Sequence, residues 1–309
     1  MFRLAHLSDI DLGTSPDMTY RQLASKRVTG YVNWQRNRRL HIRDTILDCI
    51  VADLKAAQPD HIALTGDLVN LALDVEIELA RQWLCNFGAA DMVSVVPGNH
   101  DAYVPGAFDK ACRAWGAYMT GDGAGAPTGR SAFPYMRIRD RIALIGVSSA
   151  RATAPFMANG FFREHQAERL GALLDAAAER SLFRIVMIHH PPVRGAAQQH
   201  KRLFGISLFQ KTIRRHGAEL VLHGHTHEPT TNWISAPDDP TPVVGVAAAG
   251  QAPGGSKPAA QYNLFEISGE AGGWVVKHSR RGLTGLSTGV SELSSHLLID
   301  QTEPVPEIA

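Results

Sequence analysis

Short apolar runs alternate with longer amphipathic segments along most of this chain. The runs at 61–65 (HIALT) and 92–97 (MVSVVP) are short, apolar and rich in β-branched residues, which is typical of buried strands. An apolar stripe at helical spacing marks 163–180, through Leu170, Leu173, Leu174 and Ala177. The predicted strands lie near 2–8, 61–65, 92–97, 133–138, 141–147, 183–189, 219–223, 242–248, 261–267 and 273–278. The predicted helices lie near 36–57, 73–87, 106–119, 163–180 and 206–216.

The order of these elements predicts an α/β fold with two sheets. The N-terminal part alternates strand and helix, which is typical of parallel strands. The later part is richer in strand pairs, such as 133–138 with 141–147, where Arg139-Asp140 would form a tight turn. We therefore expect a second sheet packed on the first, in one domain spanning residues 1–282.

Polar motifs stand where several of the predicted strands end. In chain order they are Asp9-Ile10-Asp11, Gly66-Asp67, Gly98-Asn99-His100-Asp101, His189-His190-Pro191-Pro192 and Gly224-His225-Thr226-His227. Because loops at the carboxyl ends of strands converge on one crevice in open α/β sheets, these side chains should meet in space. Carboxylate, imidazole and amide oxygen together are the ligand set of a pair of divalent metal ions.

This ordered set resembles the signature of the calcineurin-like metallophosphoesterases, over roughly Leu4 to His227 and on to the predicted strand near Ile267. The resemblance implies an αββα sandwich of two packed mixed β-sheets flanked by helices. It also implies two divalent metal ions, with Mn²⁺ expected and Fe, Mg²⁺ or Zn²⁺ as alternatives. The implied ligands are Asp9, Asp11 and His227 for the first metal, Asn99, His189 and His225 for the second, and Asp67 as a bridge between them.

Two further residues take catalytic roles by the same resemblance. His100 would face the substrate phosphate without binding metal. Asp101 would stand behind His100, orient it and raise its pKa, so that the imidazole stays cationic.

One position departs from the family pattern, because the family usually has histidine where this chain has Asp11. Two interpretations stay open. The carboxylate is a tolerated substitute, or it has changed the first site. A changed site would favour Mn²⁺ or Mg²⁺ over softer ions, or hold its metal weakly.

The remaining histidines differ in whether they match a ligand position of the family. In related sequences with H-Y-P at the fourth motif the first position carries the ligand, so His189 is the expected ligand and His190 a residue of the site wall. The histidines that match no family ligand position are His6, His41, His61, His200, His216 and His223.

The resemblance implies hydrolysis of a phosphodiester or nucleotide-like substrate. A hydroxide that bridges the metals would attack phosphorus in line while His100 assists the leaving group. The first alternative is a pyrophosphate-cleaving hydrolase of a nucleotide-linked lipid precursor, similar to UDP-2,3-diacylglucosamine hydrolase. A second alternative is a metal-poor, non-enzymatic module that binds a phosphorylated ligand.

Composition and charge limit the size, the partners and the location expected for this protein. The chain has 309 residues, of which 44% are hydrophobic and 20% charged, enough for one large domain. The formal net charge of +1 indicates no stable nucleic-acid partner. No leader peptide or membrane-length apolar run is visible, and Cys49, Cys85 and Cys112 are interpreted as buried thiols of a reducing compartment. A cytoplasmic protein is expected.

Two segments fall outside the family core. Residues 13–43 form a basic stretch with interleaved aromatic residues, interpreted as a solvated helix start or as a rim or lid. Such a rim would bind anionic substrate or bring 20–43 into peripheral contact with an anionic membrane at its inner face. Residues 283–309 are expected to be a tail, either disordered or docked on a partner subunit of a homodimer.

Overall fold

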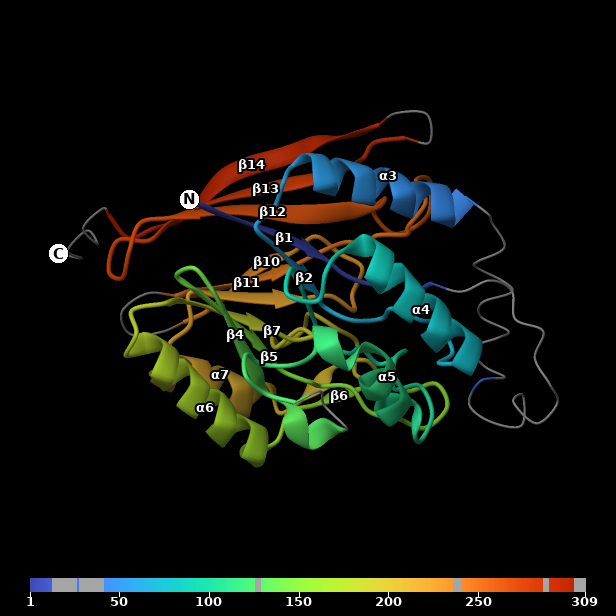
Figure 1. The fold of residues 1–309 in the computed structure, drawn as a ribbon, viewed down its shortest axis with the longest axis horizontal. Coiled ribbons are helices and arrows are strands. Elements are labelled where there is room, and N and C mark those ends of the chain that lie inside the picture. Colours follow the sequence, from blue (N-terminus) through green and yellow to red (C-terminus); the bar gives the residue numbers. More distant parts are fainter. Residues whose placement is uncertain (13–26, 28–41, 126–128, 236–239, 286–288, 303–309) are drawn as a thin grey trace.

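The computed structural model describes residues 1–12, 27, 42–125, 129–235, 240–285 and 289–302. Two six-stranded mixed sheets face each other within these residues, and helices flank them (Figure 1). In spatial order, the first sheet consists of β14 (Val290–Asp300), β13 (Val275–Leu283), β12 (Gln261–Ser268), β1 (Phe2–Leu7), β2 (His61–Leu64) and β3 (Val93–Val95). The predicted arrangement of two packed mixed sheets is confirmed.

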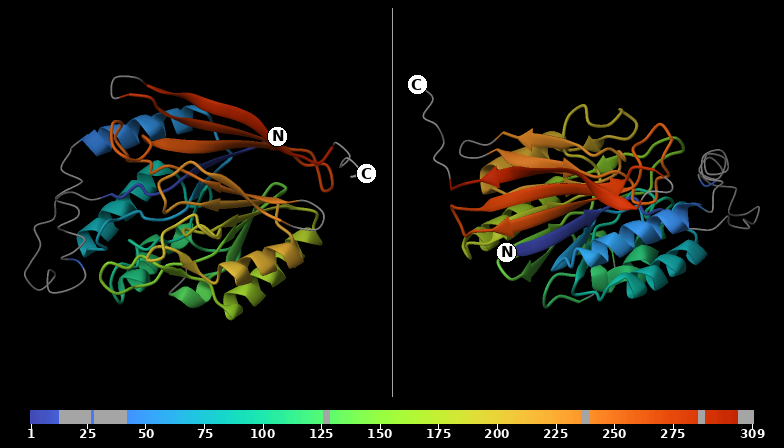
Figure 2. Two further views of the ribbon diagram at one scale, coloured as in Figure 1. Left: turned by 180° about the vertical axis from the view of Figure 1, so that it is seen from behind. Right: turned by 90° about the horizontal axis from the view of Figure 1, so that it is seen from above.

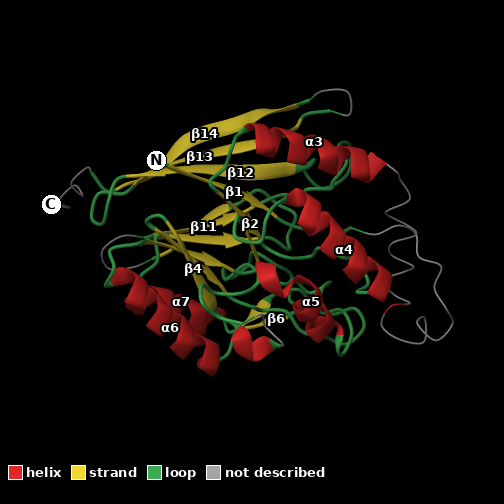
Figure 3. Cartoon of the chain, viewed as in Figure 1, coloured by secondary structure: helices red, strands yellow, loops and turns green. Residues whose placement is uncertain are grey.

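The second sheet carries the middle of the chain. Its strands, in spatial order, are β10 (Thr231–Ile234), β11 (Thr241–Gly245), β9 (Leu220–His223), β7 (Phe183–Met187), β5 (Ile142–Gly146) and β4 (Tyr135–Arg139). A separate two-stranded pair joins β6 (Gly160–Phe161) to β8 (Leu203–Phe204). The described α-helices are α3 (Ile42–Ala56), α4 (Asp74–Phe87), α5 (Ala107–Trp115), α6 (Glu164–Ala178) and α7 (Ile206–His216), and short 3₁₀ turns lie at Gly116–Tyr118 and Arg130–Ala132 (Figure 3).

Strand β7 shows how the layers are held together. Its residues point alternately to the two faces of the sheet, as the period of a strand requires. Ile185 and Met187 belong to the core between the sheets, whereas Val186 packs in a second cluster with Leu170 of α6 and Phe209 of α7. Burial on both faces explains why this strand is a continuous apolar run. Helices α6 and α7 cover the outer face of the second sheet (Figure 2).

Strands β1, β2 and β3 are parallel, as the alternating pattern predicted. The hairpin between β4 and β5 differs by one residue from the prediction. Arg139 pairs with Ile142, so the turn consists of Asp140 and Arg141 rather than Arg139-Asp140. Asp140 has a left-handed backbone with φ of 52°, a conformation that aspartate tolerates in tight turns.

The C-terminal region departs most from the sequence-based expectation. The predicted domain boundary at residue 282 falls inside β13, and β14 then pairs antiparallel with β13 as an edge strand. Residues 290–300 are therefore part of the sheet rather than of a tail. Most side chains of β14 are exposed, so its sequence lacks the apolar run that marks the buried strands.

Cys49 and Cys85 are exposed and only Cys112 is buried, so the expectation of three buried thiols is wrong for two of them. Of the helices in the described ranges, none is long and apolar enough to cross a membrane.

Candidate metal centre

Loops that follow five strand ends carry the predicted ligands. Asp9, Asp67 and Asn99 follow β1, β2 and β3 of the first sheet, whereas His189 and His225 follow β7 and β9 of the second. Both sheets therefore contribute to one site at the carboxyl ends of their parallel strands. This is the placement that the motif positions predicted.

The loop after β1 runs alongside the loop after β2. The backbone amides of Asp9 and Asp11 donate hydrogen bonds to the carbonyl groups of Gly66 and Asp67, at 2.9 Å and 3.0 Å. Five predicted ligands have left-handed backbones with φ between 51° and 69°, namely Asp9, Asp11, Asp67, His225 and His227. Each such non-glycine residue costs about 1–2 kcal/mol, and strain of this kind gathers at functional sites.

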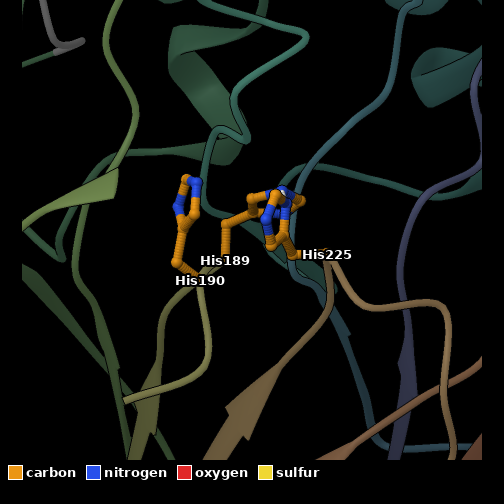
Figure 4. Close-up of side chains that lie close together, drawn as sticks. All are labelled: His189, His190 and His225. Carbon is orange, nitrogen blue, oxygen red and sulfur yellow. Dashed lines mark hydrogen bonds between the residues drawn. The ribbon is translucent and has the colours of Figure 1, made fainter. Parts of the chain in front are cut away.

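Three predicted ligand atoms surround the Nε2 atom of His189. The Oδ1 atom of Asn99 lies 3.1 Å from it, the Nδ1 atom of His225 lies 3.2 Å away, and the Oδ2 atom of Asp67 lies 3.3 Å away. Figure 4 shows the rings of His189 and His225 close together, with His190 beside them. One carboxylate, one amide oxygen and two imidazole nitrogens thus converge on one point, the donor set expected for the second metal.

Backbone carbonyls fix the orientation of both imidazoles. The Nδ1 atom of His189 donates to the carbonyl of Thr65 at 2.6 Å, and the Nε2 atom of His225 donates to the carbonyl of Lys201 at 2.9 Å. These bonds leave Nε2 of His189 and Nδ1 of His225 as the inward-facing nitrogens. Thr65 and Lys201 could not be predicted from the sequence, because a carbonyl group is present in every residue and leaves no signature.

The residues expected at the first metal lie next to this group. The Oδ1 atom of Asp9 is buried, makes no well-oriented hydrogen bond among the described residues, and lies 3.2 Å from Nε2 of His227. Ligand atoms of Asp9, Asp67 and His189 all lie within 4.8 Å of one another. Asp11 is buried and close enough to His227 for its charge to help raise the pKa of that imidazole, although burial opposes the rise and Asp9 contributes more to it. Asp11 is thus beside the site but outside the tight group.

His190 is part of the wall of the site. It lies within ligand distance of His189 and His225, but both of its nitrogens already have partners. The Nδ1 atom accepts from the Ser149 hydroxyl at 2.7 Å, and the Nε2 atom donates to the carbonyl of Ala158 at 3.0 Å. Burial, followed by the charge of His189, lowers the pKa of His190 to about 3. His190 is thus a neutral imidazole with a hydrogen bond at each nitrogen, as suits a residue of the site wall.

His100 stands at the rim of the site. Its Nδ1 atom donates to the carbonyl of Asn70 at 2.5 Å, and its Nε2 atom lies 4.0 Å from Oδ2 of Asp67. The side chain is 27% exposed, whereas that of Asp67 is 3% exposed. The Nε2 atom is therefore available to a group that enters from solvent. Asn70 is a third positioning residue that the sequence did not reveal, after Thr65 and Lys201.

The expected pairing of Asp101 with the His100 ring is not what the structure shows. The Asp101 carboxylate accepts backbone N–H groups of Asp67, Leu68, Val69 and Gly98, at 2.8–3.2 Å. Burial and the charge of Asp67 raise its pKa to about 8, against these hydrogen bonds, which lower it. The carbonyl of Asn70 orients His100 instead. Asp101 thus joins the Gly98–Asp101 loop to the loop that carries Asp67, because its carboxylate faces backbone N–H groups rather than an imidazole ring.

The charges of the site suit bound cations. Burial by itself would raise the pKa of the Asp9 and Asp67 carboxyls. The nearby imidazoles outweigh it, so that His227 lowers the pKa of Asp9 and His189 lowers that of Asp67. Conversely, burial lowers the pKa of His189 but Asp67 raises it, to about 9 overall. Protonated imidazoles thus balance the buried carboxylates. Divalent cations would supply the same charge and leave the imidazoles neutral, as metal ligands must be, so these residues fit a metal pair.

Two glycines of the motifs, Gly98 and Gly224, allow the backbone to come close to the ligand aspartates. A Cβ atom on Gly98 would lie 2.5 Å from the amide nitrogen of Asp67, and one on Gly224 would lie 2.6 Å from Oδ2 of Asp9. Neither neighbour can move without displacing a ligand carboxylate. The glycines therefore let the loops from the two sheets pack directly against the aspartates.

The family model for calcineurin-like phosphoesterases matches residues 2–229. The chain therefore belongs to the calcineurin-like phosphoesterase family, whose members depend on a binuclear metal centre. This membership and the His/Asp groups described above indicate a metal-dependent phosphoester hydrolase. No curated protein matches the chain.

Solved structures with the same fold include two phosphatases. A dimetal phosphatase from Danio rerio is 13% identical, with a TM-score of 0.58, and the match covers 95% of this chain and 98% of that one. A purple acid phosphatase from yellow lupin (Lupinus luteus) seeds is 13% identical, with a TM-score of 0.57, covering 96% of this chain and 53% of that one. At this identity the similarity establishes the fold.

A cavity of about 510 Å³ lies away from the metal centre. It is lined by the end of α7 at His216, by Trp233 of β10 and by Leu298 of β14, and it holds none of the predicted ligands. The basic-aromatic segment 13–43, proposed as a rim or lid, lies outside the described residues except for Arg27 and the start of α3.

Proposed function

We propose that this protein hydrolyses phosphodiesters with two divalent metal ions, Mn²⁺ being the favoured metal. Asn99, His189 and His225 would hold one ion, Asp9, Asp11 and His227 the other, and Asp67 both. The observation that carries this proposal is the approach of Asn99, Asp67 and His225 to Nε2 of His189, each within 3.3 Å. Bound ions would neutralise phosphate oxygens and lower the pKa of water for attack at phosphorus.

The protein's own groups supply the rest of the mechanism. His100 presents Nε2 at the rim, where a protonated imidazole would donate its proton to the departing alkoxide. The carbonyl of Asn70 holds the ring by its other nitrogen, so the donor is already oriented when substrate enters. No serine or cysteine is required as a nucleophile.

Preference for a diester rests on the resemblance of the HHPP and GHTH motifs to bacterial cyclic-nucleotide and glycerophosphodiester phosphodiesterases. Hydrolysis of a nucleotide-linked lipid precursor remains the second proposal, because its support, the segment 20–43, lies almost wholly outside the described residues. A non-enzymatic module is disfavoured by the assembled ligand set.

A Mn²⁺-dependent assay tests the proposal. Wild-type protein should hydrolyse bis(p-nitrophenyl) phosphate faster than p-nitrophenyl phosphate, and Asp67→Ala should abolish both activities and bound metal together. Asp91→Asn, a change on the exposed surface, is the matched control. Faster turnover of the monoester would refute the diester preference, and full activity of Asp67→Ala would refute the site.

A further inference from the structure

A second cavity, of about 390 Å³, lies beside the metal centre on the same edge of the second sheet. Its lining includes Arg130, Arg151 and Arg163, together with Phe161, His165 and Gln166. We call it the arginine pocket. Of the described residues that line it, none is acidic. Its volume lies in the range of small-molecule binding sites and exceeds what a lone phosphate fills.

The fold places this pocket next to the catalytic edge. Strands β9, β7 and β5 are consecutive neighbours in the second sheet and run parallel. The first two are followed by His225 and His189, and the third by the segment 148–152, which lines the pocket. Two residues of extended chain span at most about 7 Å. Arg151 is two positions from Ser149, which hydrogen-bonds His190 in the site wall.

Strand β6 lines the pocket through Phe161 and pairs with β8, and both strands lie next to residues of the metal centre. A Cβ atom on Gly160 of β6 would lie 2.5 Å from the Cγ atom of His190, so this strand packs directly on the site wall. The segment that enters β8 supplies the Lys201 carbonyl that orients His225. A ligand in the pocket would therefore be separated from the proposed metals only by the residues around His190 that form the wall of the site.

Aromatic rings hold the guanidinium groups without neutralising them. The guanidinium carbon of Arg151 lies 4.3 Å from the centre of the Phe161 ring, and that of Arg130 lies 4.4 Å from the centre of the Phe108 ring. The ring of Phe161 stacks on that of Phe204 at 4.9 Å. Cation–π contacts of this kind fix a cation without using its N–H groups as donors. Arg130 donates one hydrogen bond through Nε, to the carbonyl of Ala150 at 3.2 Å, and it lines the pocket.

The three arginines form no salt bridge with a described carboxylate, whereas Arg139 and Arg184 each pair with one. Partial burial lowers the pKa of Arg130, Asp109 raises it, and the charge of Arg151 lowers it. Arg130 and Arg151 thus lie close enough to repel each other, and an anion between them would relieve this repulsion.

From this geometry we infer that the arginine pocket binds a phosphate group of the substrate other than the one that is hydrolysed. Guanidinium groups match phosphate oxygens with paired hydrogen bonds. The inference rests on the proposed function for the position of the scissile ester. The substrate would therefore be a phosphodiester or pyrophosphate with a further phosphate group that is not attacked. A nucleotide or a lipid would supply that group.

Phosphate binding to the metal-free protein tests the pocket apart from catalysis. Chelation removes the metals, so inorganic phosphate measured by calorimetry reports on the pocket. Wild type should bind phosphate, and Arg151→Gln/Arg163→Gln should bind it at least about tenfold more weakly, the scale of a lost charge-assisted hydrogen bond. Arg180→Gln, just beyond the opposite end of α6, should bind like wild type. Equal binding by all three proteins, or none by wild type, would overturn the inference.

A matched substrate pair tests the link to catalysis. Thymidine 5′-(p-nitrophenyl phosphate) and its 3′-phosphorylated form release the same leaving group and differ by one phosphate. The double variant should lose about tenfold or more in kcat/KM on the second substrate and little on the first. Equal losses would overturn the inference. Absence of turnover on both with wild type would refute the proposed function, and the phosphate titration would still decide on the pocket.

Competition then identifies the source of the phosphate. Adenosine 3′-phosphate and a short-chain phosphatidic acid are compared as inhibitors of wild type and double variant with the unphosphorylated thymidine ester. Stronger inhibition of wild type by either compound supports the pocket and assigns the nucleotide or the lipid source. Inhibition by neither compound, or equal inhibition of both proteins, would overturn it.

Discussion

The Oδ1 atom of Asn99 lies 3.1 Å from the Nε2 atom of His189, although 90 residues separate them in the chain. Asn99 follows a strand of the first sheet, and His189 follows a strand of the second. Their contact therefore depends on the packing of the two sheets, and any change that shifts one sheet against the other should open the metal centre.

Removal of the His100 imidazole should slow the reaction without emptying the site. We expect His100→Ala to lower turnover of diesters with poor leaving groups by about 10² or more, the usual scale for a positioned acid. A p-nitrophenyl ester needs little protonation and should suffer less. Steady-state rates on both substrate types, with metal content measured alongside, check this. Equal losses on both would indicate that His100 chiefly binds phosphate.

Asp11 should influence which metal binds. We expect Asp11→His to shift preference from Mn²⁺ and Mg²⁺ towards Zn²⁺ and Co²⁺, because a neutral nitrogen replaces an anionic oxygen. The free energy of unfolding should change less than the metal preference. Metal content and activity across the four ions measure the effect. Identical profiles for variant and wild type would show that the carboxylate does not take part in metal binding.

Asp101 should act through the loops that it joins. Asp101→Asn replaces one acceptor oxygen by an amide donor that faces backbone N–H groups. We expect the free energy of unfolding to fall by about 2 kcal/mol, because buried backbone N–H groups would be left without an acceptor. Urea denaturation measures this, with Asp91→Asn as the exposed control. Unchanged stability combined with a rate as low as that of His100→Ala would restore a direct catalytic role.

Acid should destabilise the fold through buried histidines. His61 in β2 is buried and bonds Ser94 through Nε2, and burial, with Arg139 and Arg137, lowers its pKa to about 3. The unfolded chain takes up this proton at about pH 6.5, so stability is lost as pH falls below that value. At about pH 5 the loss from this one group is about 2 kcal/mol.

The variant His61→Gln isolates that contribution. Urea unfolding at about pH 7.5 and about pH 5 should show a smaller difference for the variant than for wild type. His165→Gln, an exposed change in the first turn of α6, should keep the wild-type difference. An unchanged pH dependence in His61→Gln would show that His61 is not held neutral in the folded protein.

The sequence alone determined the buried strands and the residues that end them. Parallel strands covered on both faces must be continuous apolar runs, so β2 and β7 were visible in the sequence, and each motif marks where such a run meets solvent. Strand β14 was not visible, because an exposed edge strand carries polar side chains on most positions and owes its place to pairing with β13.

Tertiary structure decided how the ligands are aimed. The carbonyls of Thr65, Asn70 and Lys201 orient three histidines, and carbonyl groups leave no trace in a sequence. The left-handed backbones of Asp9 and Asp11 also depend on neighbouring loops, so strand periodicity could not place these side chains. The arginine pocket also depends on tertiary structure, because its guanidinium groups come from three separate segments of the chain.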